Sequence, residues 1–315
     1  MQIAHFLGAG RAHRQFAFAR RDKVSTQRLS DLPRLGNFWR GRPAGRRTVS
    51  LYCRSVPYIL STVNVNGVRA AAGKGLLAWL SRTEADIVCL QETRADDTQI
   101  AAALAPALAD GWQLAHAEPG IKGRAGVGVL SRRPMRSVRV GIEPDSEFVS
   151  TGRYIEAEFD DVTVASVYVH TGEAETPRQE EKYRFLDELA ARMSTRTGAF
   201  VIAGDWNIAH TERDLKNWKG NLKKSGFLPA ERAWLDRQMG AGYVDVVRKL
   251  HPEGDGPFSW WSYRGRAFDN DTGWRIDYQL ATPEAAERAK QAVVERAATY
   301  AQRWSDHAPV TVQYR

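Results

Sequence analysis

From residue 58 onward, short runs of apolar and β-branched residues alternate with stretches of helical periodicity. Runs of this length and composition are typical of buried strands, and apolar residues three or four apart are typical of one helix face. The predicted strands are Tyr58–Val65, Asp86–Leu90, Ala125–Leu130, Arg153–Phe159, Val162–Val169, Phe200–Ala203, Ile276–Ala281 and Pro309–Tyr314. The predicted helices are Ala70–Arg82, Thr98–Leu108, Glu180–Met193, Pro229–Met239 and Glu284–Glu295. Because several strands follow one another directly, we expect mixed sheets flanked by helices in one compact domain.

Five short polar stretches lie where predicted strands begin or end. They are Asn64-Val65-Asn66-Gly67, Leu90-Gln91-Glu92-Thr93, Gly204-Asp205-Trp206-Asn207, Arg275-Ile276-Asp277-Tyr278 and Ser305-Asp306-His307-Ala308-Pro309. Ligand sites of sheet proteins collect at such positions, because strand ends are rigid and the loops beyond them are solvated. Carboxylate and amide oxygens without cysteine suit a hard cation such as Mg²⁺ or Mn²⁺. A histidine beside an aspartate suits proton handling or the stabilisation of a charged oxygen.

Composition excludes several classes of protein. The chain has 315 residues, with 43% hydrophobic and 26% charged residues, which is ordinary for a globular protein. Its only cysteines are Cys53 and Cys89, too few for a disulfide framework or a cysteine-based zinc module, and they suit a reducing compartment. No apolar run approaches the roughly 18 residues that cross a bilayer, so we expect no membrane partner.

The positive charge is concentrated at the start of the chain. The formal net charge is +8, yet the first 57 residues alone hold eleven arginines and one lysine against two aspartates, a balance of +10. Residues 58–315 therefore carry −2. We expect 1–57 to be a poorly ordered arm, because it cannot bury enough apolar surface to offset chain entropy. Three interpretations of it stay open: an inert tail or early start codon, a nucleic-acid-binding arm, or an organelle-targeting segment.

Longer motifs resemble one known family. NVNGVRA, LQET, GDWNIAH, WRIDY and SDHAP are similar to the motif series of the exonuclease III-type apurinic/apyrimidinic endonucleases, within the endonuclease/exonuclease/phosphatase superfamily. The segments DLKNWKGN, GFLPAER and FSWWSYRGRAFDNDTGWRID are similar to its DNA-repair branch in particular. The resemblance covers roughly residues 58–315. It implies a single catalytic domain with a four-layer α/β sandwich, in which two mixed β-sheets pack face to face with helices outside.

The resemblance also implies an activity and its cofactor. Such enzymes use Mg²⁺, for which Mn²⁺ can substitute, to cleave duplex DNA 5′ of abasic sites and to remove nucleotides or blocking groups from 3′ ends. In-line attack of water on phosphorus needs a group that activates the water, a cation, and donors aimed at the non-bridging oxygens. The expected partner is duplex DNA, especially abasic or 3′-blocked DNA. The expected protein is a monomeric, cytoplasmic enzyme, with organelle targeting by the arm left open.

Residue roles follow from the same resemblance. Glu92 is expected to be the main metal ligand with Asn66 beside it and Asp306 nearby. Asp205 is expected to align and deprotonate the water and, with Asn207, to lie within reach of the metal. The resemblance leaves open whether one or two metal ions bind.

The phosphate-binding groups are expected to be His307, Tyr168 and Asn207. Asp277 would fix the tautomer of His307, as in other Asp–His pairs. Whether Asp205 or His307 is the general base stays open. Asn64 and Thr171 are expected to support the site. Thr171 stands where many relatives carry Asn or Gln, so the balance between exonuclease and endonuclease activity stays open too.

DNA contacts are expected outside this centre. The loop residues Asn217, Lys219 and Asn221 are suited to hold phosphates, and Arg275 to pair with the site carboxylates or with a phosphate. Trp260 and Phe258 belong to an aromatic cluster with Trp261 and Trp274. One or two of these rings are expected to line a pocket for a flipped abasic sugar, Trp260 more directly than Trp274.

Two alternative functions are weighed against a DNA-repair nuclease. A phosphodiesterase of the same superfamily acting on lipid or inositol phosphates would show apolar membrane-docking loops and would lack the NWKGN segment. A catalytically silent nucleic-acid-binding module would lack Glu92, Asp205 or His307. All three residues and the NWKGN segment are present.

Overall fold

The computed structural model describes residues 56–315. The predictions for the basic arm, and Cys53 within it, therefore lie outside the described residues. Cys89, the free cysteine of the described part, is buried in the core. Among residues 56–315 no helix is long and apolar enough to cross a membrane.

Two six-stranded mixed sheets form the centre of the domain. The first has the order β11-β12-β1-β2-β4-β3. Its strands are β1 (Tyr58–Asn64), β2 (Ile87–Gln91), β3 (Gln113–Ala117), β4 (Val127–Ser131), β11 (Ala289–Val294) and β12 (Val310–Tyr314). The second has the order β5-β6-β7-β8-β10-β9. Its strands are β5 (Ser137–Val140), β6 (Tyr154–Glu158), β7 (Thr163–Tyr168), β8 (Phe200–Asp205), β9 (Val244–Asp245) and β10 (Asp277–Ala281).

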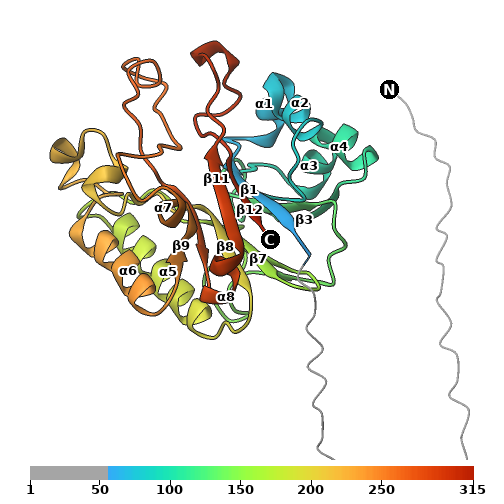
Figure 1. Ribbon diagram of the computed structural model, residues 1–315, viewed down its shortest axis with the longest axis horizontal. Helices are drawn as coiled ribbons and strands as arrows, with labels where there is room; N and C mark the ends of the chain where they lie inside the picture. The colour runs from blue at the N-terminus through green and yellow to red at the C-terminus, as the bar shows by residue number, and fades with distance from the viewer. Residues whose placement is uncertain (1–55) are drawn as a thin grey trace, which may run out of the picture. The chain divides into compact units, whose positions relative to one another are not determined.

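The sheets pack against each other through a shared apolar core and are covered by helices on their outer faces. Leu60 and Cys89 of the first sheet belong to the same buried cluster as Val164 and Ala203 of the second. The helices lie on both sides of the molecule in Figure 1. They are α1 (Val68–Ala71), α2 (Leu77–Leu80), α3 (Asp97–Ala103), α4 (Ala105–Ala109), α5 (Pro177–Ser194), α6 (Pro229–Gly240), α7 (Val246–Leu250) and α8 (Pro283–Arg288). This is the four-layer α/β sandwich that the resemblance implied.

The outer helices are held by separate apolar clusters. Phe185 and Leu189 of α5 and Trp234 of α6 pack on the second sheet. Ile100 of α3 packs with residues of β1, β2 and α2 on the first sheet. The prolines at the first positions of α5 and α6 fit there, because the missing N–H has no helical partner in the first turn.

The predicted helix Glu284–Glu295 is wrong in its second half. Helix α8 ends at Arg288, and β11 then pairs antiparallel with β12. The alanine-rich sequence favours a helix, but pairing with a strand of the core sheet outweighs that local preference. The predicted helix Thr98–Leu108 is broken at Leu104, because Pro106 in the first turn of α4 has no N–H for a continuous helix. Strands β3, β5 and β9 were not predicted, since they are short and rich in polar or small residues.

Candidate active site

The polar motifs meet because strand ends from both sheets converge at one edge of the sandwich. Strands β1 and β2 run parallel with Asn64 opposite Gln91, so Asn64 and the residue after β2, Glu92, end side by side. In the second sheet Asp205, the last residue of β8, pairs with Asp277, the first residue of β10. The site is thus built from rigid strand ends of both sheets.

Asn64 links the two sheets at the site. Its side-chain nitrogen donates to Glu92 Oε1 at 3.0 Å and to Asp205 Oδ2 at 2.9 Å. Its side-chain oxygen accepts the backbone N–H of Asn66 at 2.9 Å. Because Asn64 is completely buried and both its amide protons are engaged, it fixes the separation of two carboxylates from different sheets.

Asn207 holds both oxygens of Asp205. Its backbone N–H donates to Asp205 Oδ1 at 2.9 Å and its side-chain amide to Oδ2 at 3.0 Å. The second amide proton goes to the carbonyl of Val169 at 3.0 Å, and the hydroxyl of Thr171 donates to Asn207 Oδ1 at 3.0 Å. Both amide protons of Asn207 are therefore used within the protein, which fits the expected hold on Asp205 but leaves no proton for the expected phosphate contact.

Asp205 sits in an environment that favours its protonated form. It is 1% exposed, and burial, assisted by the charges of Asp277 and Glu92, raises its pKa to about 7 against the opposing effect of His307. A carboxyl with a pKa near neutrality can accept and release a proton at ordinary pH.

His307 faces Asp205 and is oriented by Asp277. Its Nδ1 lies 2.8 Å from Asp277 Oδ2, and its Nε2 lies 3.8 Å from Asp205 Oδ2. The hydroxyl of Ser259 also donates to Asp277 Oδ2, at 2.6 Å. Burial lowers the pKa of His307, but the Asp277 and Asp205 carboxylates outweigh it and raise the pKa to about 10. These carboxylates therefore favour the protonated imidazole, whose Nε2 is directed toward the site.

Glu92, Asn66 and Asp306 form the oxygen-rich side of the site. The Asn66 amide donates to Asp306 Oδ1 at 2.8 Å, and the Trp260 indole donates to Asp306 Oδ2 at 3.0 Å. Burial opposes ionisation of Asp306, but His307 and these donors hold its pKa below the usual range. Glu92 forms an ion pair with Arg94 through Oε2. Carboxylate and amide oxygens are what Mg²⁺ prefers, and a cation bound at Glu92 would take the place of Arg94 beside Oε2.

Asp205, Asp277 and His307 also offer ligand atoms within 4.8 Å of one another. A histidine that carries protons on both nitrogens has no lone pair for a metal ion. The residues therefore fit a hard cation at Glu92, Asn66 and Asp306 better than at this second group.

Tyr168 lies at the end of β7 and is 8% exposed. Burial, with the nearby charges of Glu92 and Asp205, raises the pKa of its hydroxyl well above the ordinary value. The hydroxyl therefore stays protonated and can donate a hydrogen bond.

A cleft of about 360 Å³ opens onto this centre. Trp260 and Trp274 line it with their rings at 86° and 6.1 Å between centroids, and Asn221 lines it from the opposite loop. Asn217 and Lys219 are exposed on the neighbouring 3₁₀ turn, where Asn221 donates to the Asn217 carbonyl at 2.9 Å. The structure thus brings Trp260 and Asn221 into the lining of the cleft, whereas Asn217 and Lys219 are not among the residues that line it.

Two expected DNA contacts are wrong. Arg275 is 1% exposed and forms ion pairs with Asp214 and Asp245, each at 2.7 Å, so it reaches neither a phosphate nor the site carboxylates. Phe258 is buried in a separate apolar cluster with Trp261 and Phe268. Motif spacing placed both residues near the site but could not tell which face of the chain each side chain occupies.

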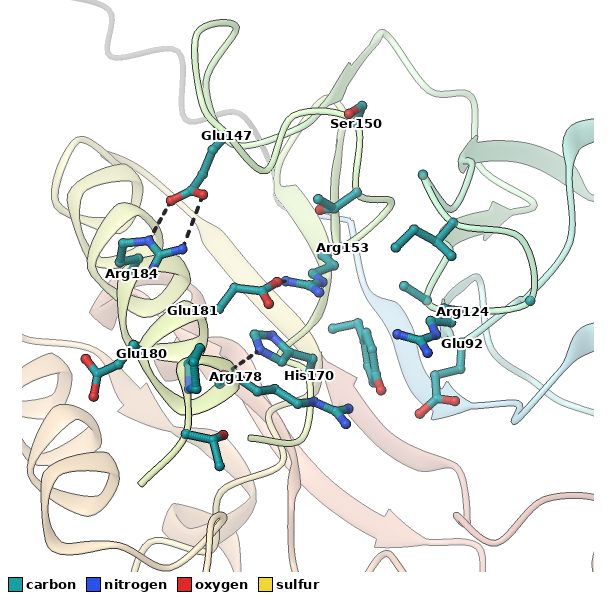
Figure 2. Close-up of a pocket in the computed structure, with 18 of the residues that line it drawn as sticks. Glu92, Arg124, Glu147, Ser150, Arg153, His170, Arg178, Glu180, Glu181 and Arg184 are labelled. Atoms are coloured by element: carbon teal, nitrogen blue, oxygen red, sulfur yellow. Dashed lines mark hydrogen bonds and ion pairs between the residues drawn. The ribbon is translucent and has the colours of Figure 1, made fainter. Parts of the chain in front are cut away.

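A larger cleft of about 1410 Å³ begins at Glu92 and Tyr168 and was not foreseen from the sequence. Figure 2 shows Arg153 turned toward Glu181 and Arg184 toward Glu147 along one wall, with Arg178 and Arg124 projecting into the space. Within residues 56–315, Arg124 and Arg178 have no acidic partner. The signal for these cations in the sequence is weak, because scattered surface arginines are usually only solvated.

The sequence did not point to Arg94 or Ser259. Arg94 pairs with Glu92, and the Ser259 hydroxyl donates to Asp277. The only hint in the sequence is their position beside the LQET motif and within FSWW.

Comparison with known proteins now decides the family. The model of the Endonuclease/Exonuclease/phosphatase family matches residues 61–307. The chain belongs to this family. It is 34% identical over 250 residues to an exodeoxyribonuclease of Bacillus subtilis, covering 78% of this chain and 95% of that protein. It is 30% identical over 266 residues to exodeoxyribonuclease III of Haemophilus influenzae, covering 80% of this chain and 98% of that protein.

Solved structures agree with this assignment. The fold is similar to the 3′ phosphatase NExo from Neisseria bound to product DNA hairpin, with a TM-score of 0.74 and 31% identity over 82% of this chain and 99% of that one. It is also similar to an AP endonuclease from Archaeoglobus fulgidus, with a TM-score of 0.73 and 27% identity. The match covers 82% of this chain and 99% of that one. The expected membership of the exonuclease III and AP endonuclease type within the Endonuclease/Exonuclease/phosphatase family is confirmed, and the protein is a nuclease, a phosphodiester hydrolase.

Proposed function

We propose that the protein is a Mg²⁺-dependent DNA-repair phosphodiesterase that nicks duplex DNA 5′ of abasic sites and removes nucleotides or blocking groups from 3′ ends. The observation that carries the proposal is the placement of Asp205 between the side-chain amides of Asn64 and Asn207 and the imidazole of His307. Asn64 and Asn207 direct its oxygens, and His307 faces it at 3.8 Å.

Glu92, Asn66 and Asp306 would hold the cation, whose charge would offset the negative charge that develops on the phosphate. Asp205 accepts the proton of the attacking water. Of the two candidate bases, Asp205 is favoured over His307, because the carboxylates around His307 keep it protonated.

His307 and Tyr168 donate to the non-bridging phosphate oxygens. Both groups are buried and fixed before substrate arrives, so little reorganisation opposes charge development in the transition state. Asp277 keeps the Nδ1 proton of His307 engaged and thereby turns Nε2 toward the phosphate. Asn207 acts on Asp205 and not on the phosphate.

Trp260 and Trp274 form the walls of the cleft beside Asp306 and His307. The two rings contact each other edge to face, so an abasic deoxyribose that has rotated out of the helix would pack against them in the cleft, and a full nucleotide is larger by its base. The indole of Trp260 also bonds Asp306, so the pocket and the cation side of the site share one residue.

The described domain has no surplus of positive charge, so phosphate contacts must be local. Asn221, Lys219 and Lys224 lie on one side of the centre, and Arg124 and Arg178 lie in the larger cleft on the other. A DNA strand that crosses the site would meet cationic groups on both sides of the scissile phosphate.

The test is a duplex with one abasic analogue, incubated with purified protein and Mg²⁺ or EDTA. The proposal predicts a nick 5′ of the lesion with Mg²⁺ alone. A duplex with a 3′-phosphate tests the 3′-end activity in parallel, which the similarity to a Neisseria 3′ phosphatase favours. Absence of Mg²⁺-dependent cleavage on both substrates would refute the proposal.

A further inference from the structure

A completely buried lysine–glutamate pair lies behind the loop that carries Asp205 and Asn207. Lys182 of α5 and Glu231 of α6 both have side chains that are 0% exposed, and Lys182 Nζ lies 2.7 Å from Glu231 Oε1. Charges buried this deeply are costly unless every proton and lone pair finds a partner. The partners of this pair therefore indicate what the pair is for.

Lys182 holds the backbone of a site residue. Its ammonium donates to the carbonyl oxygen of Asn207 at 2.9 Å. Asn207 has a φ of 48°, in the left-handed region that is unfavourable for most residues with a side chain. Lys182 thus fixes the one residue whose backbone and side chain hold both oxygens of Asp205.

Glu231 holds the opposite wall of the same cleft. Its Oε2 accepts the backbone N–H of Gly226 at 2.7 Å and that of Leu228 at 3.0 Å. Its Oε1 also accepts the hydroxyl of Ser225 at 3.2 Å and the amide of Gln179 at 3.1 Å. Ser225 and Gly226 line the cleft with Asp205 and Asn207, so one buried pair fixes both of its sides.

The two walls also meet directly at Gly226. Its φ is +93°, and a Cβ there would lie 3.1 Å from the Asn207 carbonyl oxygen, the atom that Lys182 bonds. The Ala209 N–H donates to the Gly226 carbonyl at 2.8 Å. The Asn207 turn and the 225–228 loop are therefore locked as one unit by Lys182 and Glu231.

We propose that Lys182 and Glu231 are positioning residues for phosphodiester hydrolysis at this site, an inference that rests on the proposed role of Asp205. Lys182 keeps the Asn207 turn in the conformation that directs Asp205 at the water, and Glu231 keeps Lys182 in place. Without the ammonium, the partly buried Asn207 carbonyl loses its hydrogen-bond partner and the turn relaxes. A displacement of about 1 Å at a reacting group can cost roughly 10²-fold in rate.

The test is a double-mutant cycle on the single-turnover cleavage rate of abasic duplex. Lys182→Met is expected to lower the rate by roughly 10²-fold while the Kd for DNA changes by less than about threefold. Asn207→Ala removes the side-chain amide, one of the two groups of Asn207 that hold Asp205, and leaves the backbone N–H in place. In that background Lys182→Met is expected to lower the rate by clearly less than the roughly 10²-fold loss in the otherwise wild-type protein, because the turn then holds Asp205 through its backbone N–H alone.

A matched control separates positioning from general stability. Arg192 lies near the other end of the same helix α5 from Lys182 and forms a largely buried ion pair with Glu156 at 2.9 Å. Arg192→Met is expected to lower the melting temperature as Lys182→Met does, yet to leave the cleavage rate of the folded protein unchanged. If Lys182→Met does not fold, Glu231→Gln provides the measurement, because glutamine can still accept the Gly226 N–H while loosening Lys182. A rate loss with unchanged Kd supports the inference.

Equal rates for folded Lys182→Met and wild type, equal losses for Lys182→Met and Arg192→Met, or full additivity with Asn207→Ala would each overturn the inference. A wild-type protein that cleaves neither test substrate would instead refute the proposed function, so the two failures are distinguishable.

Discussion

Arg275 provides the sharpest test of how the structure revises the sequence-based view. Its guanidinium is 1% exposed and bridges Asp214 and Asp245, whose side chains are 1% and 4% exposed. Replacing it by methionine leaves Asp245 without its cation and Asp214 with only Arg248. Removing one partner of a buried ion pair costs about 3–5 kcal/mol. For a domain of this size that corresponds to a fall of about 6 to 20 °C in melting temperature.

The pH dependence of stability gives a second readout of the same network. Burial opposes ionisation of Asp214, but Arg275 and Arg248 outweigh it and hold its pKa below the ordinary value. A depressed folded-state pKa stabilises the protein above the unfolded-state pKa of about 3.9, and this stabilisation is lost as the pH falls below that value. Arg275→Met removes part of this dependence, so its unfolding free energy should fall less steeply than that of wild type below about pH 4.

The assay is urea or thermal unfolding followed by circular dichroism, together with the Kd for abasic duplex measured well below the melting temperature. We expect a large loss of stability and a Kd within about threefold of wild type. An Arg275→Met protein with an unchanged melting temperature and strongly weakened DNA binding would refute the burial argument and restore the original assignment of Arg275 as a DNA contact.

Three further predictions concern catalysis, DNA binding and the arm. Asp277→Asn removes the acceptor that orients His307 and should lower the single-turnover rate by roughly 10²-fold or more with little change in Kd; an unchanged rate would show that the pair is only structural. Arg124→Ala should reduce the slope of log K against log salt by about 0.9, whereas the ion-paired Arg184→Ala of the same cleft should leave it unchanged; equal slopes would place the DNA elsewhere. Deletion of residues 1–57 should leave the nick rate within a few-fold at moderate salt, and a collapse of activity would make the arm part of the enzyme.

Much of the fold was accessible from the sequence because strands leave a clear pattern. Val162–Val169 alternates apolar and β-branched residues, and β7 occupies Thr163–Tyr168 within it. The failure at Glu284–Glu295 has the opposite cause, since the alanine-rich sequence favours a helix locally while its second half forms a strand. Its second half became a strand through pairing with β12, the next strand along the chain, and helix periodicity gives no sign of that pairing.

The residues of the candidate site likewise fall into those that the sequence could identify and those that it could not. Glu92, Asp205 and His307 could be singled out because each stands at a strand end within a recognisable motif. Motif spacing does not tell whether a side chain points into the site or into the core, and Arg275 and Phe258 were misassigned for that reason. Lys182 and Glu231 were invisible, because charged residues on an amphipathic helix are normally solvated and only the tertiary structure shows this pair to be 0% exposed.

The most direct test of the account is the Asp205→Asn variant on duplex DNA with one abasic analogue. Asparagine keeps the size of the side chain but cannot accept the water proton. The account predicts that Mg²⁺-dependent cleavage 5′ of the lesion disappears while the Kd for the same duplex stays within about threefold of wild type. Cleavage at the wild-type rate would contradict the role of Asp205 as the base, and loss of DNA binding would show that it serves the substrate instead of the water.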